Sequence, residues 1–284
     1  MPMVAKQALY TLLIVDDTDA QDPRKDNDNF GTMACFHNRY TLGDKVRYSE
    51  PEDFLRDLCY DTTPSGEIVA LVMENKLDYV RFEPDKEDEE SYHFMVYDDH
   101  YKKWYREDSF DGLPSDNEDE ATNSIIEWTK IPDLIELAGK HNVILPLYLY
   151  DHSGITINTT DFSCPWDSGQ LGWTYATHTE VEKEYGEITP ETLLKAKNLL
   201  QSEVEIYDLY LTGQSYGFKL YEGKRQIDSC WGFLGSISDV PKYIKEHLPY
   251  ECENIIDFLE YQPDRTHDDE YLEQTHDDEG ELER

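Results

Sequence analysis

The clearest pattern of apolar positions along the chain lies between residues 190 and 211. Apolar side chains recur there at intervals of three and four, which places them on one face of an α-helix. They are Leu193, Ala196, Leu200, Val204, Tyr207 and Leu211. Thr189 is a favourable cap, Pro190 suits the first turn, and Gly213 follows the last apolar position. The pattern therefore predicts a helix over 190–211, about 30 Å long.

Three further segments have weaker helical patterns. Residues 49–60 begin with Ser49 as a cap and Pro51 in the first turn, and Phe54, Leu55 and Leu58 form an apolar face. Residues 122–138 carry a helical pattern that is broken near Pro132. Residues 98–108 mix aromatic side chains with Lys and Arg, and we interpret them as a helix as well.

Short apolar runs bounded by turn residues predict strands. Two pairs of runs are separated by short turns and predict hairpins, at 143–150 with 155–159 and at 216–221 with 226–231. Single strands are expected at 10–15, 67–75, 77–82 and 91–97. Together these elements predict an α+β fold with a mixed or antiparallel sheet, several helices and an acidic surface.

The segment 145–173 stands apart because it contains no Lys or Arg and only three acids, Asp151, Asp161 and Asp167. Its apolar and aromatic content is typical of a core. We expect an N-terminal α+β lobe at 1–115 and a C-terminal α+β lobe at 116–262 that contains this uncharged core. An acidic tail follows at 263–284, where THDDEYLEQ and THDDEGELE form a near-repeat.

The net charge of the chain restricts its possible partners more than any sequence motif does. The 284 residues include 62 Asp and Glu against 25 Lys and Arg, a formal net charge of −37. An aromatic content of 13% is too high for a disordered polyacid, so we expect a folded protein with an acidic surface. Direct binding to nucleic acid or to an anionic membrane would oppose a large repulsion. The expected partners are instead cations, basic proteins or proteins that normally bind nucleic acid, and a homo-oligomer is left open.

The acids are concentrated at 16–28, 83–90, 107–120 and 264–283, between nearly neutral segments. Because duplex DNA carries one charge per about 1.7 Å, 37 charges correspond to roughly 60 Å of duplex. We therefore hypothesise a non-enzymatic inhibitor that occupies a DNA-binding cleft by mimicking DNA. The candidate partner-binding residues are Asp85, Glu87, Asp88, Glu89, Glu90, Asp116, Glu118, Asp119, Glu120, Asp268, Asp269, Glu270, Asp277, Asp278 and Glu279.

Two alternatives remain open at this stage. Cys164, His152 and Asp167 lie close in sequence and are the residue types of a nucleophile, a base and an orienting acid, which would suit a small thiol- or metal-dependent enzyme. Cys35 and His37 would share a face of a strand and form half of a metal site. The other alternative is an acidic regulatory or oligomeric protein without mimicry. No nucleotide-binding glycine motif is present, and no cofactor is expected.

The five cysteines have no CxxC spacing, which indicates reduced thiols in a cytosolic protein. The apolar run near the N-terminus reaches acids after about seven positions, too short for a signal or membrane segment. We therefore expect a cytoplasmic protein without a membrane span.

Two long segments, DNDNFGTMACFHNRYTLGD (26–44) and LYLYDHSGITINTTDFSCPWDSGQLG (147–172), together with DSCWGF (228–233), resemble a family of proteins encoded by phages and mobile elements. That family is of about this length and has no firm activity, so the resemblance brings no catalytic residues. It implies an accessory gene of a phage or plasmid. Such genes include antirestriction proteins and inhibitors of other DNA-sensing defences, some of them acidic DNA mimics, and an anti-defence role is expected by kind. The resemblance thus implies that the partner is a host DNA-binding or defence protein with a basic surface, met in the cytoplasm of the host cell.

Overall fold

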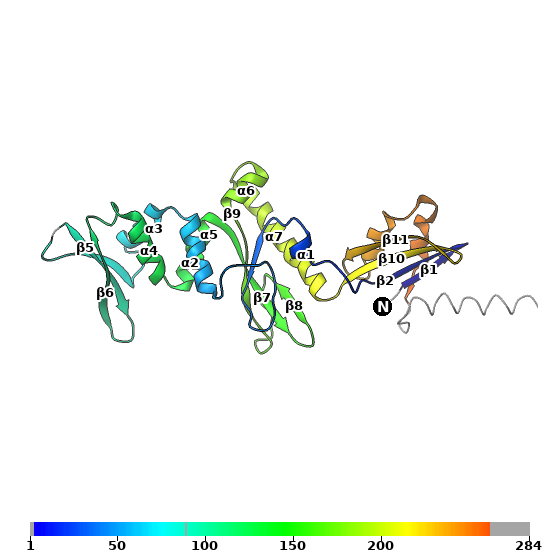
Figure 1. Ribbon diagram of the computed structural model, residues 1–284, viewed down its shortest axis with the longest axis horizontal. Coiled ribbons are helices and arrows are strands. Elements are labelled where there is room, and N and C mark those ends of the chain that lie inside the picture. Colours follow the sequence, from blue (N-terminus) through cyan, green and yellow to red (C-terminus); the bar gives the residue numbers. More distant parts are fainter. Residues whose placement is uncertain (1–2, 89, 262–284) are drawn as a thin grey trace, which may run out of the picture. The chain divides into compact units, whose positions relative to one another are not determined.

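The computed structural model describes residues 3–88 and 90–261 (Figure 1). Helices and three antiparallel sheets alternate along this part of the chain, which confirms the predicted α+β class. The described residues group into two compact units. The first contains 3–29, 148–169 and 201–261, and the second contains 30–147 and 170–200.

These units differ from the lobes predicted at 1–115 and 116–262. The reason is strand pairing between distant segments, since β2 (Tyr10–Asp16) pairs with β10 (Ser215–Glu222). A sequence pattern gives the strands but not their partners, so it favours lobes that are continuous along the chain. Strands β7 (Asn142–Asp151) and β9 (Ser168–Thr177) and helix α7 (Pro190–Leu211) pass from one unit into the other.

The first unit is built on a five-stranded sheet with the order β11-β10-β2-β1-β12. Its remaining strands are β1 (Met3–Gln7), β11 (Arg225–Leu234) and β12 (Glu260–Tyr261). Alternate residues of β2 and β10 point to one face, where α8 (Val240–Lys245) and the 3-10 helix η1 (Tyr250–Phe258) cover them (Figure 1). This core contains Leu12, Ile14, Phe218, Leu220, Ile244 and Ile255. The short helix α1 (Pro23–Asp26) also belongs to this unit, and Arg24 forms a buried ion pair with Glu203 of α7, 3.2 Å long.

The second unit holds most of the helices described. They are α2 (Pro51–Thr62), α3 (Ser65–Met73), α4 (Glu118–Trp128), α5 (Ile131–His141) and α6 (His178–Tyr185). Its three-stranded sheet has the order β4-β5-β6, formed by β4 (Val80–Pro84), β5 (Ser91–Asp98) and β6 (Lys103–Asp111). One core joins α2, α3, α4 and α5 to the sheet through Phe54, Ile68, Phe94, Ile125 and Leu134, all buried. Val181 of α6 belongs to a separate cluster with Ala176, Ala196 and Leu200.

A four-stranded sheet has the order β3-β9-β7-β8, with β3 (Thr32–Cys35) and β8 (Ile155–Asn158) at its edges. Most of the segment 145–173 lies in this sheet, and Leu147, Ile157, Leu171 and Trp173 are buried as expected of a core. The connection between β8 and β9 is the exception, because Trp166 there is 92% exposed.

Several elements match the sequence patterns closely, and two do not. The helix over 190–211, the strand at 10–15 and both hairpins are confirmed. The strand predicted at 67–75 is wrong, because these residues form α3 and bury Ile68, Val69 and Val72 on one helical face. The helix predicted at 98–108 is also wrong, because β6 begins at Lys103 and pairs along β5.

Candidate functional site

The turn between β4 and β5 carries the first predicted acidic cluster and is folded by its own carboxylates. Asp85 Oδ1 accepts hydrogen bonds from the backbone N–H of Glu87 at 2.7 Å and of Asp88 at 3.2 Å. Asp88 in turn accepts from the Ser91 hydroxyl at 2.8 Å and from the Glu90 N–H at 3.1 Å. These bonds hold the backbone of Glu87, Asp88 and Glu90, and the side chains of Glu87 and Glu90 are exposed.

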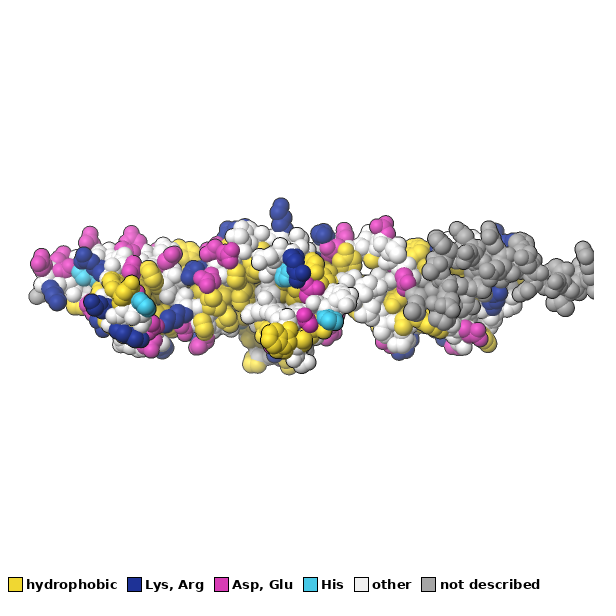
Figure 2. Space-filling model, turned by 90° about the horizontal axis from the view of Figure 1, so that it is seen from below, with side chains coloured by type: hydrophobic (Ala, Val, Ile, Leu, Met, Phe, Trp, Pro, Cys, Tyr) yellow, Lys and Arg dark blue, Asp and Glu magenta, His cyan; other side chains and the backbone are white. Residues whose placement is uncertain are grey.

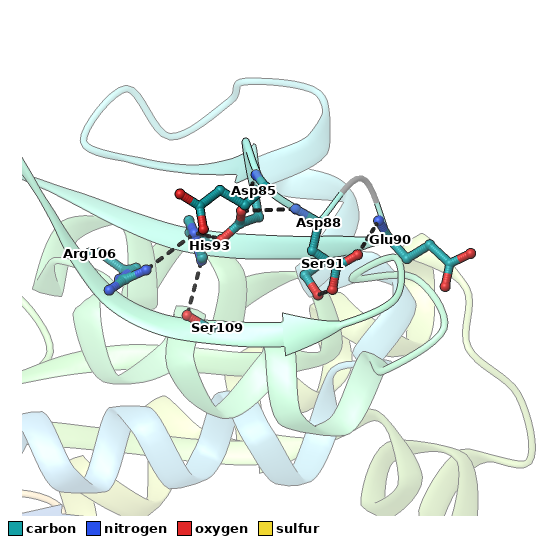
Figure 3. Close-up of polar contacts among 8 residues, drawn as sticks. Asp85, Asp88, Glu90, Ser91, His93, Arg106 and Ser109 are labelled. Atoms are coloured by element: carbon teal, nitrogen blue, oxygen red, sulfur yellow. Dashed lines mark hydrogen bonds and ion pairs between the residues drawn. The ribbon is translucent and has the colours of Figure 1, made fainter.

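His93 of β5 lies beneath this turn and ties it to the sheet (Figure 3). Its Nε2 lies 2.6 Å from Asp85 Oδ2, and its Nδ1 lies 3.0 Å from the Ser109 hydroxyl of β6. If Nε2 carries the proton that the carboxylate accepts, then Nδ1 accepts from the hydroxyl. Arg106 Nη1 lies 3.3 Å from Nε2 of His93. The backbone N–H groups of Glu87 and Asp88, and then His93, hold the pKa of Asp85 below its ordinary value, so this carboxyl is ionised at neutral pH.

The second predicted acidic cluster lies at the same end of the sheet. The backbone N–H of Gly112, just after β6, donates to the Glu90 carbonyl at 2.7 Å. The Asn117 side chain then donates to the Asp111 carbonyl at 2.8 Å, directly before α4 begins at Glu118. Segments that are more than twenty residues apart therefore meet. We call this surface the acidic sheet end, and it consists of Glu87, Asp88, Glu90, Asp111, Asp116, Glu118, Asp119 and Glu120.

All side chains of the acidic sheet end are exposed. Among residues 3–88 and 90–261, none of them forms an ion pair. The positive end of the α4 dipole favours Glu118, Asp119 and Glu120 in its first turn. Lys86 is the one base within the turn itself. The surface thus presents concentrated negative charge, and hydrogen bonds hold the backbone of Glu87, Asp88 and Glu90.

On the face drawn in Figure 2, the acidic side chains do not form one continuous surface. Asp and Glu side chains lie there in small groups, with Lys, Arg and hydrophobic side chains between them. Glu89 lies outside the described residues, as do Asp268, Asp269, Glu270, Asp277, Asp278 and Glu279. The structure therefore brings together the predicted residues at 85–90 and 116–120 that it describes.

Sequence reasoning missed the residues that support this surface. His93, Arg106 and Ser109 were not recognised, since an isolated His in a strand is usually a core residue. Asp111 was not singled out, although it belongs to the acid run at 107–120. The alternation of SYHFMVY places His93 on the face opposite Phe94, and that pattern was the available signal.

The residues of the alternative thiol site also converge, in the first unit. His152 Nδ1 lies 3.3 Å from Asp167 Oδ2, and the Cys164 thiol lies 3.7 Å from the same oxygen. Asp167 therefore stands between the thiol and the imidazole. A nucleophile, base and orienting acid require the imidazole in the middle. The side chains are also open to solvent, since His152 is 64% and Asp167 38% exposed.

Two further hydrogen bonds close a turn around these residues. The Ser168 hydroxyl donates to the Cys164 carbonyl at 2.6 Å, and the Asp151 N–H donates to the Asp167 carbonyl at 2.8 Å. Pro165 and Trp166 form the tip of this turn. The geometry therefore assigns Asp167 to holding the turn that precedes β9, and it does not support the predicted catalytic roles.

We expect Asp167→Ala to lower the stability of the protein more than Cys164→Ser. The alanine variant loses the contacts of one carboxylate with both His152 and Cys164, a cost of about 1–2 kcal/mol. Serine keeps a donor toward Asp167 and should cost less than about 0.5 kcal/mol. Urea unfolding measures both. A larger loss for Cys164→Ser would contradict the assignment of Asp167 as the centre of the turn.

Cys35 and His37 do not form a metal site within the described part of the chain. His37 Nδ1 accepts from the backbone N–H groups of Arg39 and Tyr40, both at 3.2 Å, and its ring stacks on Tyr40. Cys35 lies in β3 opposite Gly172. No group of three or more His, Cys, Asp or Glu among these residues could hold a metal ion.

None of the five cysteines forms a disulfide, and all five lie in the described residues. Burial raises the pKa of Cys59 to about 12, so this thiol is unreactive at neutral pH. Within the described residues, no helix is both long and apolar enough to cross a membrane. Comparisons with protein-family models, with curated proteins and with solved structures gave no match.

Proposed function

We propose that this protein is a non-enzymatic acidic inhibitor that binds a basic, DNA-binding surface of a host DNA-processing or DNA-sensing protein. The acidic sheet end is the contact surface. The source is a phage or plasmid, the site of action is the host cytoplasm, and the role is anti-defence. The observation that carries this proposal is the meeting of two acidic segments through the Gly112–Glu90 hydrogen bond.

Two properties of the turn favour binding, its negative charge and the hydrogen bonds that hold its described backbone. Asp85 and Asp88 hold the backbone, so Glu87 and Glu90 are presented from a defined conformation. A preorganised surface loses less conformational freedom on association. Carboxylates presented in this way can replace phosphates in contacts with Lys and Arg. A basic cleft would then release the counterions that it also releases on binding DNA.

The net charge of −37 argues against nucleic acid as the direct partner. It also favours fast association with a cationic protein, because opposite charges steer the encounter. The thiol site offers no comparable support, since Asp167 separates Cys164 from His152. Inhibition by occupancy of a DNA-binding surface is therefore the function that the described geometry favours.

Competition with duplex DNA tests this proposal. The tagged full chain is used to capture host proteins at low salt, and the captured protein is then purified and titrated. We expect duplex DNA and this protein to exclude one another from that partner, and we expect affinity to fall at least about tenfold between 50 and 200 mM salt. A ternary complex with DNA, or an affinity that does not depend on salt, would refute mimicry.

A further inference from the structure

Strand β6 forms one edge of the three-stranded sheet in the second unit. Seven of its nine residues are exposed, and Phe110 is its one buried residue. β5 pairs with β6 along one side, and within residues 3–88 and 90–261 no strand pairs with the other side. We call this open side of the strand the β6 edge.

The hydrogen-bond pattern shows which backbone groups point outward from the β6 edge. In an antiparallel pair, residues that exchange hydrogen bonds with the partner strand alternate with residues that do not. Gly112 donates its N–H to the Glu90 carbonyl, so these two residues form a pair of the bonded kind. Counting back along the register from this pair, Asp111 and Ser109 are of the other kind. Their backbone N–H and C=O groups therefore point away from β5.

The same reasoning applies at the start of β6, on the other side of the bulge in this pair. Tyr97 of β5 donates its N–H to the carbonyl of Tyr79, directly before β4, so the backbone groups of Tyr97 face away from β6. Trp104 lies opposite Tyr97, and Arg106 lies opposite Met95, two residues before it. The backbone groups of Trp104 and Arg106 therefore point outward as well.

Two other strand edges in this chain are closed by carboxylates. Asp208 accepts the N–H of Ile157 in β8 at 2.8 Å, and Asp44 accepts the N–H of Met33 in β3 at 2.8 Å. Such contacts satisfy backbone groups that would otherwise be open to a further strand. A single side chain is thus enough to close an edge of these sheets.

The β6 edge is closed only near its C-terminal end. The Asn117 side chain donates to the Asp111 carbonyl, and the Ser109 N–H lies 2.8 Å from the carboxylate of the residue before it. The described part of the chain offers no such partner to the outward backbone groups of Trp104 and Arg106. An added strand could bond these groups without breaking a bond inside the molecule.

Charge varies along the β6 edge. Lys103 and Arg106 lie in the first half of the strand, whereas Glu107, Asp108 and Asp111 lie in the second half. Asp111 also belongs to the acidic sheet end, so the edge continues into that surface. Charged side chains on an edge strand hinder pairing with apolar strands. A strand that pairs here must therefore carry bases beside the second half of β6.

A second copy of this chain does not meet that requirement. The outward groups of two β6 strands match when Arg106 of one copy lies opposite Ser109 of the other. In that register Glu107 lies opposite Asp108 of the second copy, and like charges directly opposite one another are destabilising. The net charge of −37 on each copy adds to the repulsion.

We propose that an extended, basic segment of the partner protein adds to β6 as a fourth strand of this sheet. The inference rests on the function proposed above and states how the partner engages the acidic sheet end. Trp104, Arg106 and Ser109 would supply main-chain hydrogen bonds. Lys or Arg side chains of the segment would bind Glu107 and Asp111. The main-chain bonds give affinity, and the charges fix the direction in which the segment runs.

Amide hydrogen exchange of the full chain, free and bound to the captured host partner, tests strand addition. We expect exchange at the N–H groups of Trp104 and Arg106 to slow at least about tenfold on binding, because the added strand accepts these hydrogen bonds. Amides of β11, the exposed edge strand of the first unit, should keep their rates. This measurement needs no variant of the protein.

Competition of the same complex with duplex DNA separates the two proposals. Competition without protection of these amides would refute strand addition and leave the proposed function standing. Protection without competition would support strand addition and refute DNA mimicry. Protection in the free protein that rises with its concentration would overturn the proposal, because it would assign the edge to a second copy. Capture of no host protein would remove both proposals.

Proline and alanine at Ser109 provide a matched pair of variants. Both lose the hydroxyl contact with His93 and both keep the charge of the chain, but only proline lacks an N–H and places its ring at the open edge. We expect Ser109→Pro to bind the partner at least about tenfold more weakly than Ser109→Ala. Circular dichroism and the thermal midpoint check that both variants are folded. Equal affinities of the two folded variants would overturn the proposal.

Discussion

Replacing Glu87, Glu90 and Asp116 by lysine is expected to reduce affinity for the captured host partner at least about 100-fold, or roughly 2.7 kcal/mol. Each replacement changes the charge by two, so the variant changes by six. Carboxylates that attracted a basic cleft become ammonium groups that repel it, and like charges across an interface cost several kcal/mol. Isothermal calorimetry or surface-based binding at physiological salt measures the difference.

These three side chains are suited to the test because their removal spares the fold. The hydrogen bonds of the turn come from Asp85, Asp88 and Ser91, and His93 holds Asp85 from below. The three side chains to be replaced are exposed. The variant should therefore keep the thermal midpoint of the natural protein within a few degrees.

A matched control lies in the same unit. Glu182, Glu184 and Glu187 are exposed in and just after α6, and their replacement by lysine changes the net charge equally. If position matters, this control keeps affinity within about threefold. If both variants lose affinity equally, bulk charge rather than the acidic sheet end drives binding, and the proposed contact surface is wrong.

Local signals predicted the elements whose caps and periodicity agree. Helix α7 has Pro190 in its first turn and an apolar stripe along its length, and its bounds follow these signals. The hairpin of β10 and β11 follows from two alternating runs around Gly223. In such segments the neighbouring residues along the chain determine the structure.

Sequence patterns predicted the wrong secondary structure in segments whose conformation depends on tertiary packing. Residues 67–73 read as a strand because the run EIVALVM is apolar and β-branched, but Ile68 and Val72 fill a core between helices. Residues 98–108 suggest a helix because they mix aromatic side chains with Lys and Arg, yet β5 offers the part from Lys103 onward a partner strand. Tertiary contacts outweigh propensities of a few tenths of a kcal/mol per residue.

In the candidate site, too, local sequence predicted some features and tertiary contacts determined the others. Composition was enough to find the acids at 85–90 and 116–120. Their meeting depends on the pairing of Ser91 with Asp111 and on the Gly112–Glu90 bond, which no local pattern encodes. The spacing of His152, Cys164 and Asp167 made them candidates for one site, but it left open whether they converge. The order of the contacts, with Asp167 in the middle, was not.

Gly172→Ala is expected to lower the thermal midpoint by about 6–12 °C. Gly172 of β9 has φ +156°, which L residues rarely adopt, and an added Cβ would lie 1.9 Å from the Ala34 carbonyl oxygen. That oxygen belongs to the backbone of β3, so no side chain can rotate away. The strain and the forced separation of β3 from β9 together cost about 3 kcal/mol, and each kcal/mol corresponds to about 2–4 °C in a protein of this size.

The damage should spread to the core of the second unit. Ala34 is fully buried, and Trp173, the residue after Gly172, stacks on Phe54 of α2 with ring centres 5.8 Å apart. Moving β9 away from β3 therefore also disturbs the helix that organises this core. The expected sign is a shift of tryptophan emission to longer wavelength in the folded variant, in addition to the lower midpoint.

Gly169→Ala is the matched control, because Gly169 lies in the same strand and an added Cβ there meets no atom within 4 Å. Its midpoint should stay within about 2 °C of the natural protein. Differential scanning fluorimetry compares the two. Equal midpoints for both variants would mean that β3 and β9 tolerate separation at Gly172. The glycine at the end of the 147–172 motif would then owe its place to something other than the close approach of these two strands.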